Sequence, residues 1–261
     1  MIHKYYETAE VISHSSSHGV YTLVVDAPQI ATTAKPGQFV LVYLGDDRHL
    51  LGRPISICDA NKRSGSFTMK YVIAGAGTQI MSSWQPGHFF KVLGPLGNGF
   101  DIRHIKQESR VALMGGGIGI PPLYLLAKEL KKIGALVDVY LGFKQEIPTL
   151  VQCFDDFSNS INIVSEDGNS KNTGYVTDFL PETPAYDTIF SCGPIPMLAA
   201  LARYSYAHNI ACQVSVEERM ACGLGACKGC VVKTFVESKP GYQLCCQNGP
   251  VFDSKEVIWN E

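Results

Sequence analysis

The sequence predicts a fold of the α/β plus all-β class: an antiparallel β-barrel, then a doubly wound α/β domain, then a small cysteine-rich domain. Short alternating apolar runs separated by turn residues fill residues 6–91, which is typical of an antiparallel barrel or sandwich. From Arg110 onward a strand, a glycine loop, a helix and another strand follow one another, which indicates a parallel sheet. Five of the nine cysteines lie between Cys222 and Cys246. We place the domains at residues 1–102, 103–211 and 212–261.

In the first domain, turn residues separate the predicted strands. The turns are Pro36-Gly37, Gly45-Asp46-Asp47 and Pro86-Gly87. Strands are expected at residues 19–25, 38–43, 66–72 and 88–93, and a further strand is expected to begin at Arg53.

Two segments of the first domain carry groups suited to a phosphorylated ligand. The run Arg53-Pro54-Ile55-Ser56 offers a cation for pyrophosphate and a hydroxyl for the edge of a flavin ring. The run Lys70-Tyr71-Val72 leads into Gly75-Ala76-Gly77-Thr78, where glycines allow close approach to phosphate and Tyr71 offers a stacking face. Taken alone, the second segment is explained better by a β-hairpin with a core tyrosine.

The second domain begins with a β-loop-α-β unit. A strand at 110–114 precedes the loop Gly115-Gly116-Gly117-Ile118-Gly119-Ile120-Pro121-Pro122, a helix at 123–133 and a strand at 135–143. The glycine spacing differs from the G-x-G-x-x-G fingerprint, and a plain strand-to-helix turn is the alternative to a nucleotide-binding loop.

Two further strands are expected at 161–164 and 188–191, and a helix at 197–207. The second strand runs into Cys192-Gly193-Pro194. From the residues alone, Cys192 is best explained as a buried thiol at the end of a strand. A last strand at 213–220 is expected to lead directly into the cysteine segment.

The cysteine segment has the spacing of an iron-sulfur site. Cys222, Cys227 and Cys230 follow the pattern C-x4-C-x2-C, which is typical of plant-type [2Fe-2S] proteins, and either Cys245 or Cys246 supplies the fourth thiolate. The alternatives are a structural zinc site, disulfides or buried thiols. Zinc sites usually pair C-x2-C with a second such pair or with histidine, and no histidine follows His208.

Composition excludes several classes of protein. Hydrophobic residues make up 46% and charged residues 18% of the 261 residues, and the net charge is -2, so no nucleic-acid partner is expected. The start lacks an apolar signal region, so we expect a cytoplasmic protein with free thiols. Residues 111–127 carry no charge, but four glycines and two prolines there favour a buried strand and loop over a membrane span.

The order of these motifs resembles the ferredoxin-reductase superfamily. The matching segments are Pro36-Gly37-Gln38-Phe39, Arg53-Pro54-Ile55-Ser56, Gly75-Ala76-Gly77-Thr78, Gly94-Pro95-Leu96-Gly97, Gly115 to Pro122 and Cys192-Gly193-Pro194-Ile195-Pro196-Met197. The resemblance implies an FAD-binding barrel, a nicotinamide-nucleotide loop at Gly115, Gly116, Gly117 and Gly119, and a cysteine, Cys192, beside the nicotinamide ring. A single cation, Lys144, follows the second strand of the α/β domain, which favours NADH over NADPH.

Over its full length the chain resembles the electron-transfer subunits of type B dihydroorotate dehydrogenase. The closest matches are Glu217-Glu218-Arg219-Met220-Ala221-Cys222-Gly223 and Asn248-Gly249-Pro250-Val251-Phe252. That alignment selects Cys246 as the fourth ligand, although Asn248 replaces the usual aspartate. It also implies FAD, a [2Fe-2S] cluster, NAD and an FMN-containing catalytic subunit in a heterotetramer of two plus two.

The resemblance implies a mechanism without an acid or base from this chain. A flavin exchanges hydride with NAD and single electrons with an iron-sulfur cluster, and the partner oxidises dihydroorotate to orotate. Met220, Leu224 and Ala226 are expected contacts with that partner. The alternatives are a subunit of another flavin and iron-sulfur oxidoreductase, of the ferredoxin:NADP reductase or sulfhydrogenase type, and a zinc-stabilised interaction protein without enzymatic activity.

Overall fold

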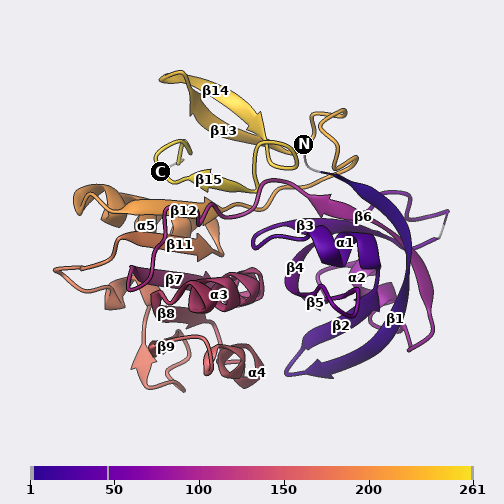
Figure 1. Ribbon diagram of the computed structural model, residues 1–261, viewed down its shortest axis with the longest axis horizontal. Coiled ribbons are helices and arrows are strands. Elements are labelled where there is room, and N and C mark those ends of the chain that lie inside the picture. Colours follow the sequence, from indigo (N-terminus) through magenta and orange to yellow (C-terminus); the bar gives the residue numbers. More distant parts are fainter. Residues whose placement is uncertain (1–2, 46, 260–261) are drawn as a thin grey trace.

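A computed structural model describes residues 3–45 and 47–259 of the chain. The barrel and the α/β sheet lie side by side, and a small C-terminal hairpin stands above them (Figure 1). Asp46, the centre of the predicted turn Gly45-Asp46-Asp47, lies outside the described residues. The predicted fold class is confirmed.

The first domain is a closed antiparallel barrel with the strand order β1-β2-β5-β4-β3-β6. Alternate residues such as Leu23, Val25 and Met69 fill its interior, which explains the alternating sequence pattern. Two short helices cover its ends. The elements are β1 (Tyr5–Ser17), β2 (Val20–Asp26), α1 (Pro28–Thr33), β3 (Phe39–Tyr43), β4 (Arg53–Asn61), β5 (Ser66–Val72), α2 (Ala76–Met81) and β6 (Phe89–Leu96).

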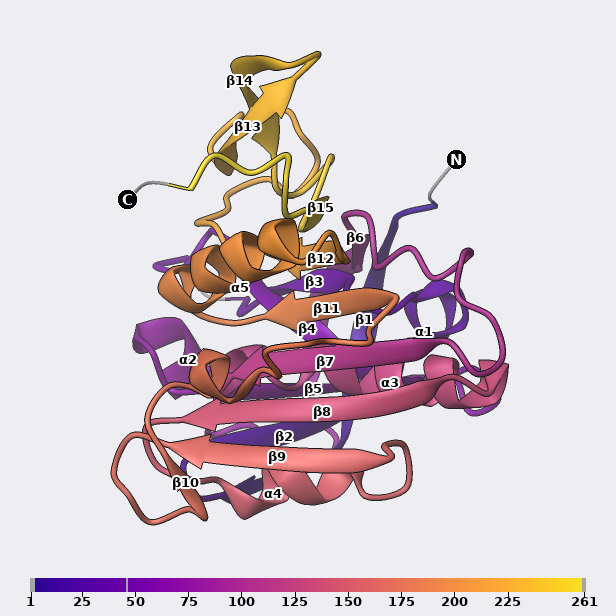
Figure 2. The same cartoon turned by 90° about the vertical axis from the view of Figure 1, so that its left-hand side faces the viewer.

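The second domain is a sheet of order β10-β9-β8-β7-β11-β12-β15, parallel except for β15. Its central strand β7 (Arg110–Gly116) is apolar throughout because both of its faces are covered. Ala112 and Met114 share a core with α5, while Val111 and Leu113 share one with α3. Figure 2 shows these two helices on opposite sides of the sheet.

The remaining elements of the sheet are α3 (Pro122–Ile133), β8 (Leu136–Phe143), α4 (Pro148–Val151), β9 (Ser160–Ser165), β10 (Asn172–Thr173), β11 (Thr188–Cys192), α5 (Ile195–Ala207), β12 (Ala211–Ser215) and β15 (Val251–Asp253). The predicted elements among them agree with the sequence-based boundaries to within two residues, except β12, whereas α4, β10 and β15 were not predicted. Residues 111–127 form β7, a turn and the start of α3. Among the described residues no helix is long and apolar enough to cross a membrane.

The predicted strand at 213–220 is wrong beyond Ser215. Ser215 is the last residue of β12, and it pairs with Cys192, the last residue of β11. Beyond Ser215 the chain finds no further residues of β11 to pair with, so it leaves the sheet. One more backbone bond, from Val216 N to Pro250 O at 2.9 Å, marks the point of departure.

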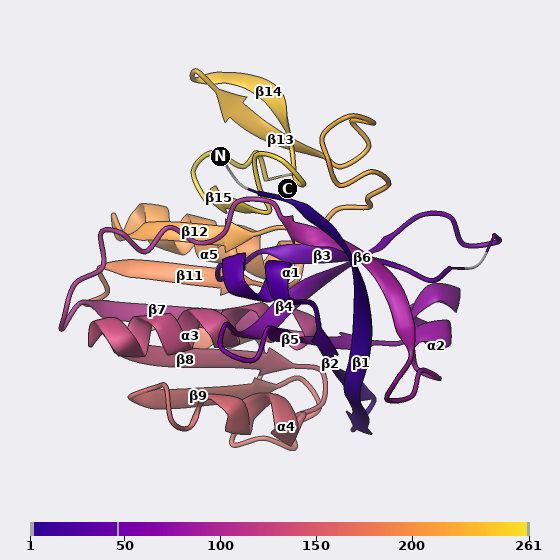
Figure 3. The same cartoon turned by 45° about the vertical axis from the view of Figure 1, so that its right-hand side comes forward.

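The C-terminal segment leaves the sheet and then returns to it. Strands β13 (Val231–Val236) and β14 (Lys239–Leu244) form a hairpin, whose turn residues Glu237 and Ser238 have φ of 50° and 66°, as a two-residue primed turn requires. Strand β15 then pairs antiparallel with β12. Figure 3 shows the hairpin projecting above both larger domains. The proposed domain boundary at residue 212 therefore falls inside β12. This strand pairs with β11 of the α/β domain on one side and with β15 of the C-terminal segment on the other.

An ion pair joins the barrel to the α/β domain. Lys128 Nζ on α3 lies 2.7 and 2.9 Å from the carboxylate oxygens of Asp59 on β4, and each side chain is 25% exposed. We expect Lys128→Ala to lower the free energy of unfolding by about 1 to 2 kcal/mol, because Asp59 loses a charged partner in a half-buried position.

Lys132→Ala is the matched control for this prediction. Lys132 pairs with Glu129 of its own helix, and its side chain is 66% exposed. The control should therefore change stability by less than about 0.5 kcal/mol. Urea unfolding of the two variants makes the comparison, and equal effects would show that the ion pair does not hold the domains together.

Candidate functional site

A cavity of about 700 Å³ lies between the barrel and the carboxyl edge of the α/β sheet. Separate parts of the chain line it, chiefly strands β4 and β5, the loop after β7 and the segment after β12, with single residues from α2 and from the turn before β15. Among the lining residues are the predicted site residues Arg53, Pro54, Ile55, Ser56, Lys70, Tyr71, Val72 and Thr78, together with Ile118, Ser215, Val216, Glu217 and Pro250. The structure therefore brings the barrel motifs of the sequence to one concave surface.

The direction of the Arg53 side chain is set by backbone carbonyls. Its guanidinium donates to the carbonyl oxygen of His49 at 3.1 Å and also to that of Leu51. Gly77 lies directly against this side chain, so that a Cβ at residue 77 would overlap the guanidinium. Because Gly77 has no side chain, the Arg53 guanidinium can lie against it in the cavity wall.

Tyr71 is more enclosed than its motif suggests. Its ring stacks on Tyr21, with ring centroids 5.3 Å apart. Nδ1 of His14 lies 2.9 Å from the carbonyl oxygen of Trp84 and so carries the hydrogen, which leaves Nε2 to accept from the Tyr71 hydroxyl at 3.0 Å. Burial raises the pKa of Tyr71. Tyr71 is therefore a fixed, neutral part of the wall, and only a small part of its ring is accessible from the cavity.

The glycine loop packs against the segment that contains Cys192. Gly115 and Cys192 are paired on adjacent parallel strands. A Cβ at Gly119 would lie 2.6 Å from the carbonyl oxygen of Cys192, and one at Gly116 would lie 2.7 Å from the ring of Pro194. This contact requires glycine, because backbone atoms there leave no space for a side chain. Both predicted segments thus meet at the carboxyl edge, where doubly wound sheets bind ligands.

Cys192 is almost fully buried beneath this contact. Burial raises the pKa of its thiol to about 12, and the nearby carboxylate of Glu217 acts in the same direction. Gly193, the next residue, has a φ of 158° and approaches Gly116 closely. Cys192 is therefore a protonated thiol below the glycine loop, not a nucleophile.

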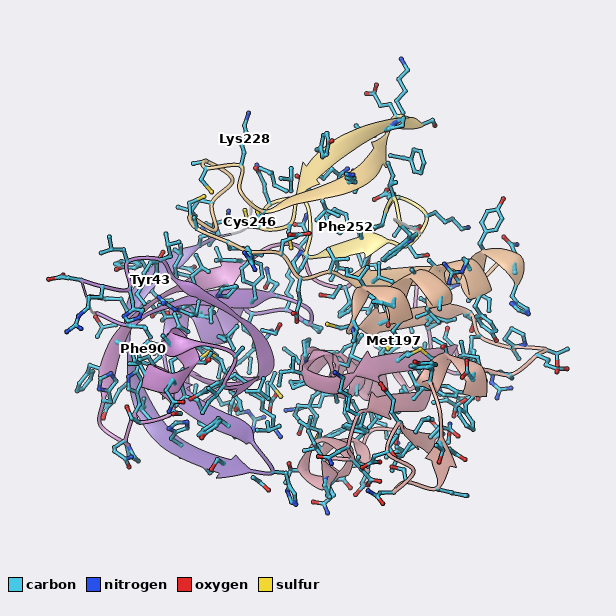
Figure 4. The ribbon with its side chains drawn as sticks, turned by 180° about the vertical axis from the view of Figure 1, so that it is seen from behind. Tyr43, Phe90, Met197, Lys228, Cys246 and Phe252 are labelled. Carbon is cyan, nitrogen blue, oxygen red and sulfur yellow. The ribbon has the colours of Figure 1, made fainter. Side chains whose placement is uncertain are left out.

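The cysteine segment lies beside the barrel, and Figure 4 shows Cys246 and Lys228 there. Cys222 Sγ accepts hydrogen bonds from the backbone amides of Leu224 and Cys227, both at 3.4 Å. The amide of Cys227 is the main reason that the pKa of Cys222 falls to about 6. Cys230 Sγ accepts from the amide of Cys246 at 3.4 Å. Amides directed at sulfur are the environment that an iron-bound thiolate needs.

The sulfur atoms form two pairs in this structure, Cys222 with Cys227 and Cys230 with Cys246. Within the described ranges, no three His, Cys, Asp or Glu side chains are close enough together to hold a metal ion. All nine cysteines are free thiols, so the disulfide alternative finds no support.

The side chains of Cys245 and Cys246 point in different directions. Cys245 Sγ donates to the carbonyl oxygen of Val216 at 3.3 Å and is fully buried in the core. Burial raises its pKa. Cys246 instead adjoins Cys230, and its pKa rises to about 11 through burial and the hydrogen bond with that neighbour. Only Cys246 is placed with the other cysteines of the motif.

Comparison with known proteins identifies the family. Residues 217–258 match the iron-sulfur cluster binding domain of dihydroorotate dehydrogenase B, and residues 6–100 match the oxidoreductase FAD-binding domain. The electron transfer subunit of dihydroorotate dehydrogenase B (NAD(+)) from Geobacillus sp. (strain WCH70) is 38% identical over 256 residues, which cover 97% of this chain and 98% of that protein. The chain belongs to this family.

Other relatives agree with this assignment. The subunit of the same name from Clostridium acetobutylicum is 38% identical over 261 residues, or 100% of this chain and 98% of that protein. A chain of the NADH-dependent reduced ferredoxin-NADP oxidoreductase has the same fold, with a TM-score of 0.82 and 26% identity over 96% of this chain and 89% of the other. The identity to dihydroorotate dehydrogenase B subunits is higher, so the other oxidoreductase types and the zinc-stabilised interaction protein are set aside.

The structure adds site residues that the sequence did not reveal. Glu217 lines the cavity, and burial raises the pKa of its carboxyl. Asn98 on the barrel side donates to the carbonyl oxygen of Gln247 at 3.2 Å and to that of Asn248 at 2.8 Å. Asn248, which stands where the family usually has aspartate, accepts from the amide of Leu244 at 2.9 Å with its side-chain oxygen. Glu218 lines the same cavity, and only the departure of the chain from β12 brings these two carboxylates there.

Proposed function

We propose that this electron-transfer subunit of dihydroorotate dehydrogenase B passes electrons between an FMN-containing catalytic subunit and NAD, through FAD and a [2Fe-2S] cluster. One observation carries the proposal: the barrel motifs, the loop after β7 and the segment leading into Cys222 all border the same cavity. A flavin bound there lies between a nicotinamide site and an iron-sulfur site. FAD supplies the needed chemistry, because it exchanges hydride with nicotinamide and single electrons with iron-sulfur clusters.

The residues of the cavity wall fit FAD. Arg53 provides a cation for the pyrophosphate, and its orientation is already fixed by the carbonyls of His49 and Leu51. Ser56, Lys70 and Thr78 provide further polar contacts, while Pro54, Ile55 and Val72 provide apolar ones. Tyr71 contributes a rigid wall, held by Tyr21 and His14.

We assign the nicotinamide nucleotide to the edge formed by Gly115, Gly116, Gly117, Gly119 and the segment Cys192-Gly193-Pro194. The glycines there allow the phosphates to approach the backbone and the start of α3. NADH is favoured over NADPH by the surroundings of Lys144 at the end of β8. The amides of Glu166 and Asp167 donate to the carbonyl oxygens of Phe143 and Lys144, so two acidic residues lie next to the end of β8. A 2'-phosphate bound there would be close to these carboxylates as well as to the single lysine.

We assign the [2Fe-2S] cluster to Cys222, Cys227, Cys230 and Cys246. The spacing and the amides directed at Cys222 and Cys230 support this set. In the complete enzyme we propose two catalytic and two electron-transfer subunits, working in the cytoplasm, where electrons flow from dihydroorotate to NAD.

Reconstitution with the catalytic subunit of a relative tests this function. The complex should reduce NAD in a dihydroorotate-dependent reaction, whereas the catalytic subunit alone should reduce an artificial dye but not NAD. The proposal is wrong if the complex forms with full FAD and iron content and still fails to couple dihydroorotate oxidation to NAD.

Gly77→Ala is expected to lower the affinity for FAD by about tenfold, which corresponds to the loss of one charge-assisted contact. The new methyl group displaces the Arg53 guanidinium from the cavity wall. Gln79→Ala, two residues later on α2, is the control, because Gln79 is exposed and does not line the cavity. Fluorescence titration of the FAD-stripped proteins measures both affinities. An unchanged affinity in Gly77→Ala would exclude Arg53 from the flavin site.

A further inference from the structure

Three large apolar side chains near the cysteine segment are strongly exposed. Leu50, in the loop between β3 and β4, is 75% exposed, Tyr6 on β1 is 61% exposed, and Leu224 between Cys222 and Cys227 is 49% exposed. Apolar side chains scattered singly over a surface are ordinary, but a group of them around one site marks an interaction surface. The question is therefore whether these three are neighbours.

Packing contacts connect them. A Cβ at Gly223, next to Leu224, would lie 2.7 Å from Leu41 Cδ1, so the cysteine loop rests directly on the barrel. A Cβ at Gly52, at the end of the Leu50 loop, would lie 2.8 Å from Leu41 Cβ and 3.2 Å from the ring of Tyr43. Tyr43 in turn contacts the ring of Tyr6, with centroids 5.7 Å apart. Leu41 and Tyr43 of β3 therefore form the floor from which all three exposed side chains rise.

We propose that Leu50, Tyr6 and Leu224 form a docking surface for the catalytic subunit, so that the FAD-binding barrel, and not the cysteine loop alone, binds the partner. The proposal rests on the proposed function, in which electrons enter this chain at the cluster held by Cys222 and its companions. Family membership establishes that a catalytic subunit exists. A partner close enough to exchange electrons with the Cys222 loop must cover Leu224, and packing through Leu41 and Tyr43 connects this loop with Tyr6 and Leu50.

The composition of the surface fits a permanent subunit contact. The buried core of a protein interface is apolar, and tyrosine is enriched among the residues that carry most of the binding energy. Lys91 Nζ lies 5.8 Å from the centre of the Tyr6 ring and bonds to Thr8 at 2.6 Å, which adds a charged edge. Closure of an apolar surface over the Cys222 loop also removes the cluster site from water, and solvent exposure is one of the factors that set cluster potentials.

Leu50→Glu tests the proposal, and Tyr206→Glu is the matched control. Tyr206 is 76% exposed, but it lies on α5, on the side of the sheet away from the barrel (Figure 2). Titration calorimetry with the catalytic subunit should show an affinity lowered by at least about tenfold for Leu50→Glu, in the range of an interface hot spot, and unchanged for Tyr206→Glu. NADH oxidation with ferricyanide should stay at the wild-type rate in both variants, since neither residue lines the cavity.

Three outcomes would overturn the proposal. Wild-type affinity in both Leu50→Glu and Tyr6→Ala would remove the barrel from the interface. A wild-type chain that forms a dimer by light scattering, and that Leu50→Glu converts to a monomer, would assign the surface to a second copy instead. Loss of affinity in Tyr242→Glu alone would place the partner on the outer face of the β13–β14 hairpin, where Tyr242 is exposed. Failure of the proposed function is separate, because NADH would then leave the iron-sulfur absorption of the wild-type chain unchanged.

Discussion

Cys246→Ser is expected to abolish the iron-sulfur centre, whereas Cys245→Ser is expected to leave it intact. Cys246 adjoins Cys230 and follows the spacing of the motif, while Cys245 donates to the carbonyl oxygen of Val216 in the core. A serine at position 245 can keep that hydrogen bond. A cluster that lacks one of four thiolates binds iron weakly, so the iron content of Cys246→Ser should fall to about one tenth or less.

Iron analysis and the electron paramagnetic resonance spectrum of the dithionite-reduced proteins measure this difference. FAD content serves as the internal control, because both cysteines are distant in sequence from the barrel motifs and a folded variant should retain its flavin. The reverse result, with iron lost in Cys245→Ser and kept in Cys246→Ser, would show that the ligand loop rearranges on metal binding and that the core contact of Cys245 is given up.

Gly119→Ala is expected to raise the KM for NADH at least tenfold while FAD stays bound. The added Cβ would lie 2.6 Å from both the carbonyl oxygen of Cys192 and the Cα of Gly193. These are backbone atoms of a parallel sheet, so they cannot move aside as a flexible side chain can. The loop must move instead, and a displaced phosphate-binding loop loses at least one charge-assisted contact of about 1.5 kcal/mol or more.

Steady-state oxidation of NADH with ferricyanide gives the KM, and Gln79→Ala, an exposed position outside the cavity, again provides the control. A KM equal to that of the wild type in Gly119→Ala would mean that the nicotinamide nucleotide does not use this loop. A proportional loss of FAD and of NADH binding would instead indicate that the domain had unfolded locally, which urea titration would reveal.

The fold was predictable wherever each strand carries its own signal. Strand β5 alternates because it faces the barrel interior on one side, and β7 is apolar throughout because α3 and α5 cover both faces. Helix α3 ends where predicted, at Gly134, whose φ of 83° makes it a left-handed cap. Local periodicity was sufficient for these elements.

The elements that were predicted incorrectly or missed depend on strands that are distant in the sequence. Strand β12 ends at Ser215 because β11 ends beside it, although the sequence remains compatible with a strand up to Met220. Strand β15 has three residues, and its pairing with β12 is set by the path of the whole C-terminal segment. The same path brings Glu217 and Glu218 to the cavity, and so the sequence alone could not place these carboxylates there.

The motifs predicted which residues come together better than how exposed each of them is. The Arg53 and Thr78 motifs line one cavity, as their order along the chain suggested. Tyr71 carries an obvious aromatic ring, yet Tyr21 covers one face of it and His14 holds its hydroxyl. A motif specifies which residue is present, whereas its exposure depends on neighbours contributed by other strands.

The visible spectrum of the anaerobically purified chain, recorded before and after addition of NADH, tests the central claim most directly. We predict flavin bands together with iron-sulfur absorption, both bleached by NADH in the absence of the catalytic subunit, with about one FAD and two irons per chain. A chain that contains FAD and iron in these amounts, but whose iron-sulfur absorption does not change when NADH bleaches the flavin, would contradict the proposed path through the shared cavity.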